Sequence, residues 1–277
     1  VAPGRSERPD DFTPGAWHPA GHDGCPFCEG NESKTPPEVE ADRPEGGEAN
    51  GPGWATRTVP NLYPAVAPRE SGEAADQRKV AGRAGTESSA FSSPADPLLA
   101  SGRGSEPDMF ASRPAYGSHE VIVNSPFHLA SLAELEEQSL AAAVAAWRSR
   151  MRAHSDSAYV QLILNQGPDS GASLEHSHAQ LGAMEFVPPS VARERERVGA
   201  YRERTAGASL LGEILREEVR RGERLVAIDE EVALICPWAS RHPYEMRLVP
   251  RRPVARFEED EGGAAMLGRA IRALTEL

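Results

Sequence analysis

The chain has 277 residues, enough for a sizeable core in one large or two smaller domains, and a formal net charge of −12 at pH 7. This charge argues against a general nucleic-acid binder, which carries a basic face, and no apolar run approaches the ~20 residues that cross a membrane. Three cysteines, two of them in a Cys-x-x-Cys, are too few for a disulfide framework and favour a reducing, cytoplasmic setting.

The first third of the chain contains a metal-ligand motif and a low-complexity segment. Cys25-Pro26-Phe27-Cys28 offers two thiols at the spacing of a zinc half-site, which needs two further ligands from elsewhere. A redox role would need a strand–helix context that the proline-rich surroundings do not offer. A turn with unliganded thiols is the alternative. Residues 66–115 are rich in Gly, Ser, Ala and Pro without periodicity, which predicts a flexible surface insertion.

Regular elements are predicted from residue 119 onward. Residues 119–124 and 159–164 have the β-branched and apolar content of strands, and a further extended run covers 180–187. Between the first two, Ser131-Leu132-Ala133-Glu134 predicts a capping box that opens a helix reaching about Met151.

The last third also predicts a mixture of helices and strands. Residues 191–221 predict a solvated helix with i,i+4 charge pairs. Residues 225–236 predict a hairpin around an acidic turn, followed by another strand near 250. A final helix is expected from about Glu259 to the end of the chain.

The densest group of functional side chains lies between the strand at 159–164 and the extended run. The segment reads Asn165-Gln166-Gly167-Pro168-Asp169-Ser170-Gly171-Ala172-Ser173-Leu174-Glu175-His176-Ser177-His178-Ala179-Gln180. Residues two apart in an extended segment share a face, so we expect His176, His178 and Gln180 to line one side. A glycine-rich loop brings backbone N–H groups close to an anion, and a histidine beside it is a candidate nucleophile toward phosphorus. Packing could explain one histidine or one glycine loop, but the combination favours a functional site.

The pattern Asn-x-Gly-x-x-x-Gly-x-Ser-x-x-His-x-His-x-Gln resembles the active-site signature of galactose-1-phosphate uridylyltransferases, nucleotidylyltransferases of the histidine-triad superfamily. The resemblance implies that His178 attacks the α-phosphate of a nucleotide sugar and forms a covalent nucleotidyl-histidine. It implies that Gln180 hydrogen-bonds the phosphoryl oxygens. It also implies that three residues hold the phosphates and orient the nucleophile: Asn165, Gly171 and Ser173.

The same resemblance extends to the cysteine pair, because Cys-x-x-Cys-x-Gly-Asn resembles the zinc half-site of this family. The zinc ligands it implies are Cys25, Cys28, His128 and His176. His119 lies just ahead of His128, but the family pattern places the ligand after Ser-Pro, which selects His128. Such a four-coordinate site would be closed and structural.

Two other segments resemble substrate-binding parts of the family. Arg5 and Arg8 resemble an early arginine pair near the phosphates, although a flexible terminus explains them equally well. Asn61 and Tyr63 match an Asn-x-aromatic turn that borders the nucleoside, with a loop around a buried tyrosine as the alternative.

The fold implied by the resemblance is α+β, with two tandem histidine-triad-like repeats forming an antiparallel half-barrel sheet flanked by helices. Residues 1–190 would form the N-terminal repeat with the active site and the zinc half-site, and residues 191–277 an apparently truncated C-terminal repeat. The implied enzyme is a galactose-1-phosphate uridylyltransferase that transfers uridylyl from UDP-glucose to a hexose 1-phosphate by a ping-pong route. Family members are commonly homodimers, and we expect neither nucleic acid nor membrane as a partner. Gln180 favours transfer over hydrolysis, because an amide cannot act as a general acid or base near neutral pH.

Two departures from the pattern keep other functions open. Ser177 stands where bacterial uridylyltransferases often have proline and resembles the plant-type ADP-glucose phosphorylase branch, and Leu62 stands where aspartate is often found. An ADP-glucose or dinucleoside-polyphosphate phosphorylase would use the same histidine. The other alternative is a zinc-stabilised nucleotide-binding module without turnover.

Overall fold

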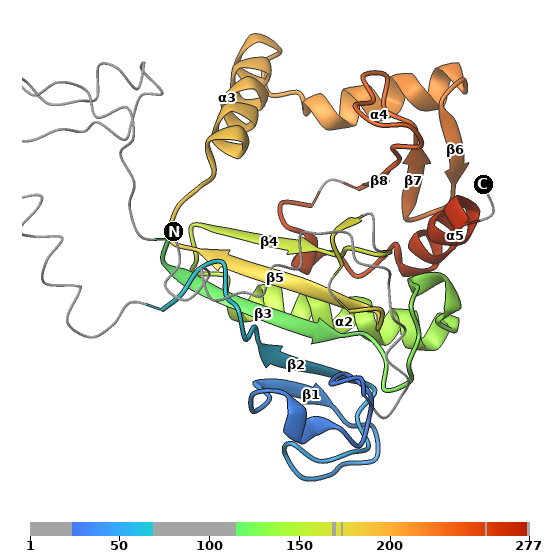
Figure 1. Ribbon diagram of the computed structural model, residues 1–277. Coiled ribbons are helices and arrows are strands. Elements are labelled where there is room, and N and C mark those ends of the chain that lie inside the picture. Colours follow the sequence, from blue (N-terminus) through green and yellow to red (C-terminus); the bar gives the residue numbers. More distant parts are fainter. Residues whose placement is uncertain (1–23, 69–114, 168–169, 173, 253, 276–277) are drawn as a thin grey trace, which may run out of the picture.

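A computed structural model describes residues 24–68, 115–167, 170–172, 174–252 and 254–275. Its first half is built on a five-stranded antiparallel sheet in the order β1-β2-β3-β5-β4 (Figure 1). The strands are β1 (Glu40–Asp42), β2 (Thr56–Pro60), β3 (Gly117–Val123), β4 (Tyr159–Ile163) and β5 (His178–Met184). The three strands predicted from residue 119 to 187 are confirmed, and β1 is an addition that the sequence did not reveal. β3 and β5 pair along their whole length, from Gly117 opposite Met184 to Val123 opposite His178.

The alternation of side chains in β5 explains the two faces of this sheet. Ala179, Leu181 and Ala183 are buried on one face, where they join the core formed with helix α2 (Glu137–Ala153). His178 and Gln180 therefore point to the opposite face. The sheet is thus apolar toward the helix and carries the candidate functional side chains, His178 and Gln180, on the other side.

The start of α2 differs from the prediction. The capping box is present, since Ser131 Oγ accepts from the Ala133 N–H and the Glu134 carboxylate accepts from the Ser131 N–H at 2.8 Å. It opens a single 3₁₀ turn, η4 (Leu132–Glu134), rather than the long helix. Leu135 then adopts an extended conformation (φ −70°, ψ 135°) that buries its side chain in the core, so α2 begins at Glu137.

The charged segment after β5 forms two helices, so the single helix predicted over 191–221 is wrong. α3 (Pro189–Arg204) has no buried residue, and α4 (Leu210–Arg221) follows it. Gly207 between them has φ +104°, a conformation that interrupts a helix and that glycine adopts without strain. In Figure 1, α3 stands apart from the five-stranded sheet.

A three-stranded antiparallel sheet completes the described chain, and its predicted hairpin is confirmed. It comprises β6 (Leu225–Ile228), β7 (Val232–Ile235) and β8 (Arg247–Pro250), followed by η6 (Phe257–Glu259) and α5 (Ala264–Thr275). The last helix therefore begins later than expected. Leu215 of α4 packs on one face of this sheet and Met266 of α5 on the other.

Helix α5 joins the two sheets, because Leu267 and Ile271 also pack against the core beneath α2. The antiparallel α+β class is confirmed. The division into repeats at residues 1–190 and 191–277 stays a prediction, and most of the 66–115 insertion lies outside the described residues. Within the described chain, no helix combines the length and the apolar character needed to cross a bilayer.

Candidate active site

A cavity of about 620 Å³ lies on the face of the five-stranded sheet opposite α2. Strands β2, β3, β4 and β5 form its floor, and the segment around Cys25–Cys28 contributes Phe27 to its wall. Six residues predicted for catalysis or substrate binding line it: Asn61, Tyr63, Asn165, Gly171, His178 and Gln180. Arg5, Arg8 and Ser173 lie outside the described residues.

His178 is the first residue of β5 and is 5% exposed. Its Nδ1–H donates to the main-chain carbonyl of His176 at 2.7 Å, which leaves Nε2 as the ring nitrogen that carries a lone pair. Burial lowers the pKa of His178 below its ordinary value, although the carbonyl partner acts in the opposite direction. The imidazole is therefore neutral near pH 7, the form in which a histidine can act as a nucleophile.

Gln180 shares the cavity face with His178 and is hydrogen-bonded to a residue that sequence reasoning did not assign to the site. Gln180 Oε1 lies 3.1 Å from His119 Nε2, and His119 also lines the cavity. The sequence pattern raised His119 only as an alternative to His128 among the metal ligands. The signal that could have revealed its position was the period of two in β3, which places His119 on the same face as Val121 and Val123.

Asn61 and Tyr63 form a tight turn at the rim of the cavity. The Asn61 N–H donates to the His119 carbonyl at 2.8 Å, and Asn61 Oδ1 accepts from the Tyr63 N–H at 2.8 Å. Such a bond from a side chain to the backbone two residues on fixes the turn. Tyr63 is 36% exposed, so the alternative of a buried tyrosine is wrong.

The loop that precedes His176 turns at two glycines. Gly167 and Gly171 have φ of +85° and +78°, in the left-handed region that other residues rarely adopt. A Cβ would meet no atom within 4 Å at either position, so backbone conformation rather than lack of space explains the glycines. The loop brings Asn165 and Gly171 to the cavity on the side of His178.

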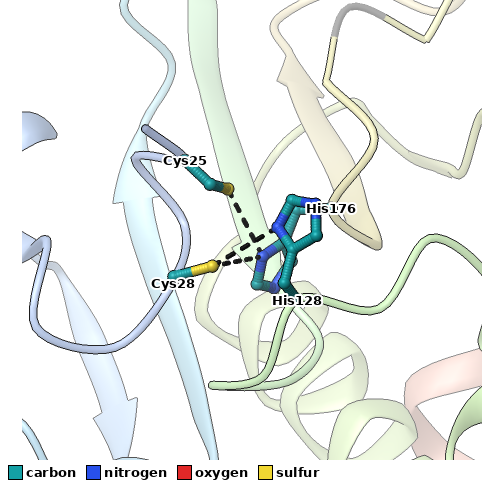
Figure 2. Close-up of side chains that lie close together, drawn as sticks. All are labelled: Cys25, Cys28, His128 and His176. Carbon is teal, nitrogen blue, oxygen red and sulfur yellow. Dashed lines mark hydrogen bonds between the residues drawn. The ribbon is translucent and has the colours of Figure 1, made fainter. Parts of the chain in front are cut away.

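Behind the cavity, Cys25, Cys28, His128 and His176 form a compact cluster whose four ligand atoms all lie within 4.8 Å of one another. Figure 2 shows both thiols directed at the two imidazole rings. Cys25 Sγ lies 3.5 Å from His176 Nδ1, and Cys28 Sγ lies 3.4 Å from His128 Nδ1 and 3.6 Å from His176 Nδ1. Ligands of a tetrahedral zinc, with Zn–S near 2.3 Å and Zn–N near 2.05 Å, stand roughly 3.5 Å apart. The predicted residues are thus brought together with the chemistry and spacing of a structural zinc site.

Outer contacts of the cluster also fit a metal. His176 Nε2–H donates to the Ser125 carbonyl at 2.8 Å, which leaves Nδ1 directed at the cysteines. His128 Nε2 and Glu175 Oε2 are buried 3.9 Å apart without hydrogen-bond partners, so a small movement would give the carboxylate–histidine pair typical of metal centres. Burial, reinforced by Cys25, raises the pKa of the Cys28 thiol to about 12, and a bound cation would reverse that shift.

A buried hydrogen-bond chain fixes the backbone between the two histidines of the motif. Trp147 Nε1–H of α2 donates to Asn124 Oδ1 at 2.9 Å, and Asn124 Nδ2 donates to Ser177 Oγ at 3.1 Å. The Ser177 N–H donates to the Leu129 carbonyl at 2.6 Å. Proline has no N–H and no hydroxyl, so serine at this position is part of the local structure rather than a neutral replacement.

Comparisons with known proteins agree with this arrangement. Residues 63–188 match the family model described as galactose-1-phosphate uridyl transferase, N-terminal domain. Over 284 residues the chain is 25% identical to an ADP-glucose phosphorylase of Arabidopsis thaliana, covering 99% of this chain and 69% of the relative. Over 141 residues it is 33% identical to a galactose-1-phosphate uridylyltransferase of Streptomyces lividans, covering 50% of this chain and 40% of the relative.

The fold has solved counterparts. The crystal structure of an ADP-glucose phosphorylase from Arabidopsis thaliana with bound ADP-glucose superimposes with a TM-score of 0.63 at 24% identity, covering 99% of this chain and 70% of that one. This likeness shows a shared fold. Residues 63–188 thus contain a segment that matches the N-terminal domain of galactose-1-phosphate uridyl transferases, and this segment includes His178 and Gln180.

Proposed function

We propose that this chain transfers a nucleotidyl group from a nucleoside-diphosphate sugar by double displacement at His178. The observation that carries the proposal is the hydrogen bond from His178 Nδ1–H to the His176 carbonyl, which reserves Nε2 for bonding in the cavity. Nε2 forms a bond to the α-phosphorus, and the bond from that phosphorus to the bridging oxygen breaks, releasing the sugar 1-phosphate. An oxygen of a second phosphate then attacks the same phosphorus and restores the neutral histidine.

The other cavity residues would position the phosphates and stabilise the charge that develops on them. Gln180 is proposed to donate from its amide nitrogen to a phosphoryl oxygen, and Asn165 with the Gly171 loop to hold the phosphate chain. Asn61 and Tyr63 would border the nucleoside. Arg5, Arg8 and Ser173 keep their proposed phosphate contacts on the family pattern alone.

The nucleotide base separates two versions of this reaction. The active-site motif predicts a uridylyltransferase that acts on UDP-glucose and a hexose 1-phosphate. The ADP-glucose phosphorylase, however, is similar over 99% of this chain, whereas the Streptomyces uridylyltransferase is similar over 50%. Leu62, which is 66% exposed at the cavity rim, also departs from the aspartate of many uridylyltransferases. These observations favour ADP-glucose as the donor and inorganic phosphate as the acceptor.

Zinc is proposed to hold the catalytic strand in place rather than to take part in the chemistry. His176 would bind the metal, and the chain continues through Ser177 to His178. Bound zinc would link the Cys25–Cys28 segment and His128 to this strand, and its four protein ligands would leave no open position for substrate. The proposed nucleophile would thus be placed by the metal without contacting it.

The proposal is tested by intact-mass spectrometry after brief incubation with ADP-glucose or UDP-glucose. The sample is kept near neutral pH, because a nucleotidyl-histidine bond hydrolyses in acid. We expect an adenylyl adduct that is absent from a His178→Ala variant and disappears when inorganic phosphate is added. A uridylyl adduct that hexose 1-phosphate removes would establish the uridylyltransferase version. With folded, zinc-loaded protein, the lack of an adduct from either donor would contradict catalysis and favour a binding module.

A further inference from the structure

We propose that His119 is a positioning residue that holds the Gln180 side chain with its amide nitrogen toward the substrate phosphate. This inference rests on the proposed function, because it assumes that Gln180 meets a phosphoryl oxygen in the cavity. His119 comes from β3 and Gln180 from the neighbouring strand β5, and both line the cavity.

The tautomer of His119 follows from its contact with the backbone. The Ala65 N–H donates to His119 Nδ1 at 2.9 Å, so Nδ1 carries the lone pair. In a neutral imidazole the proton must then be on Nε2. Ala65 belongs to the segment that follows the Asn61–Tyr63 turn, so a substrate-side loop fixes the protonation of a residue within the sheet.

The proton on Nε2 determines how the Gln180 amide is oriented. His119 Nε2 lies 3.1 Å from Gln180 Oε1 and 3.4 Å from Asn61 Nδ2. Asn61 Nδ2 is a donor, and the Asn61 oxygen already accepts from the Tyr63 N–H. Gln180 Oε1 is therefore the acceptor for His119 Nε2–H. The opposite amide orientation would bring two donors together at this contact.

The strand register brings the two side chains together. His119 stands opposite Gly182, and Val121 stands opposite Gln180, so His119 and Gln180 are diagonal neighbours on one face. A Cβ at Gly182 would meet only the Met184 side chain within 4 Å, so the register rather than the missing side chain of Gly182 explains the contact.

Orientation matters because the two ends of the amide have opposite effects on a phosphate. The NH₂ group donates to an anionic oxygen, whereas the carbonyl oxygen would repel it. Since glutamine itself has no preference between the two orientations, its partner must choose. The geometry assigns that choice to His119, which is not a member of the metal cluster.

Two substitutions separate the two hydrogen bonds of His119. His119→Gln places an amide near the position of Nε2, which can donate to Gln180 but can also accept from it, whereas His119→Asn reaches only the Nδ1 position and keeps the contact with Ala65. We expect His119→Asn to slow adduct formation by about tenfold or more, less than the 10²–10³-fold typical of deleting a transition-state donor. We expect a smaller loss in His119→Gln, because its amide permits the productive orientation of Gln180 without enforcing it. Zinc content and Tm should be equal in the two variants.

A double-mutant cycle with Gln180→Leu tests whether His119 acts through Gln180. The loss caused by His119→Asn should disappear in the Gln180→Leu background, because no amide remains to be oriented. Equal losses in His119→Asn and His119→Gln, or a loss that persists in the Gln180→Leu background, would overturn the proposal.

A second measurement decides the inference without turnover and so separates its failure from that of the proposed function. Nitrogen NMR of the imidazole should show the Nε2–H tautomer for His119, and the Gln180 side-chain NH₂ signal should shift more in His119→Asn than in His119→Gln. An Nδ1–H tautomer would overturn the inference even if the enzyme forms the adduct. A wild type without any adduct would instead contradict the proposed function and leave this test intact.

Discussion

At the scale of single residues, Asn124 links the outer helix to the His-Ser-His segment. Its side chain satisfies both Trp147 Nε1–H and Ser177 Oγ in a fully buried position. Asn124→Ala should lower the free energy of unfolding by about 2–4 kcal/mol, because it leaves two buried polar groups without partners. Urea denaturation checks this value.

Ser177→Ala is the matched control for the Asn124 prediction. It removes one hydrogen bond and keeps the Ser177 backbone N–H, so we expect a loss of only about 1 kcal/mol. Equal losses in the two variants would show that the bond to Trp147 adds nothing to stability.

Glu38 and Glu217 allow the effect of burial on acid stability to be measured. Burial alone would raise the pKa of Glu38, but hydrogen bonds from Arg43, the Asn50 backbone and Arg57 outweigh it and lower the pKa to about 2. Because the folded-state pKa is below the unfolded one, Glu38 stabilises the fold above pH 4.5, and this contribution is lost as the pH falls from 4.5 toward 2. Glu38→Gln should therefore cost about 2 kcal/mol at pH 7 and flatten the acid limb of the stability curve.

The pKa of Glu217 is also lowered to about 2, by hydrogen bonds from Arg220 and Arg221, but its carboxylate is on the exposed surface of α4. Water and salt screen such pairs, so Glu217→Gln should leave the stability unchanged within error. Unfolding measured between pH 3 and 7 compares the two variants. An equal change in the pH dependence of stability for Glu38→Gln and Glu217→Gln would contradict the stabilising role assigned to Glu38 and its arginine partners.

At the scale of elements, the pairing of β3 with β5 depends on a glycine at its end. Gly117 has φ +154°, and a Cβ there would lie 1.9 Å from the Ala183 carbonyl oxygen. Gly117→Ala should push the two strands apart and lower the free energy of unfolding by about 3 kcal/mol, as for other backbone clashes at special conformations. Thermal unfolding and the rate of adduct formation should both report the change.

Gly199→Ala in α3 is the matched control for this prediction. Gly199 is helical, and a Cβ would meet no atom within 4 Å. Alanine should stabilise the protein by about 0.5–1 kcal/mol there, because it has the higher helix propensity. Destabilisation at Gly199 would mean that α3 contacts something in solution that the described chain does not contain.

Sequence patterns predicted elements well where one period dominated. The alternation in β5 and the acidic turn between β6 and β7 were sufficient to place those strands. The start of α2 could not be predicted, because burial of Leu135 in the tertiary core outweighs a local capping box. The break between α3 and α4 depends on the backbone conformation of Gly207, which a glycine permits but does not require.

At the scale of the whole molecule, the candidate metal centre joins three distant segments. Removing the metal should release the Cys25–Cys28 segment and His128 from His176, so we expect a lower Tm and loss of adduct formation on chelation, both restored by zinc. Measured zinc content should be near one per chain and should fall in Cys25→Ser. Unchanged Tm and adduct formation in metal-free protein would contradict a structural role.

Cys236→Ser provides the control for this experiment. Cys236 is partly exposed in the second half of the chain and is not a member of the cluster. The variant should keep its zinc, its Tm and its adduct. Loss of zinc in both variants would point to thiol oxidation rather than to the loss of a ligand.

The site could be predicted from sequence to the extent that its residues sit in a short motif. The family resemblance of that motif selected His178 and Gln180, which the structure places in the cavity, and, with the cysteine pair, the four cluster residues, which it brings together. Their roles stay predictions. The period of two in β3 could have placed His119 on the cavity face, but its contact with Gln180 depends on the register between β3 and β5, which no local pattern encodes. The homodimer and the cytoplasmic location stay predictions.

The order of the cluster ligands along the chain has a consequence for biosynthesis. A ribosome completes Cys28 100 residues before His128 and 148 residues before His176. Throughout that interval a nascent chain carries two neighbouring thiols without their imidazole partners, exposed to oxidants and to competing metals. All four ligands are present only after His176 has been synthesised, and His178 follows two residues later. Completion of the ligand set is therefore a late event in the synthesis of this half of the protein, and the two thiols are the part of a nascent chain that waits longest for its partners.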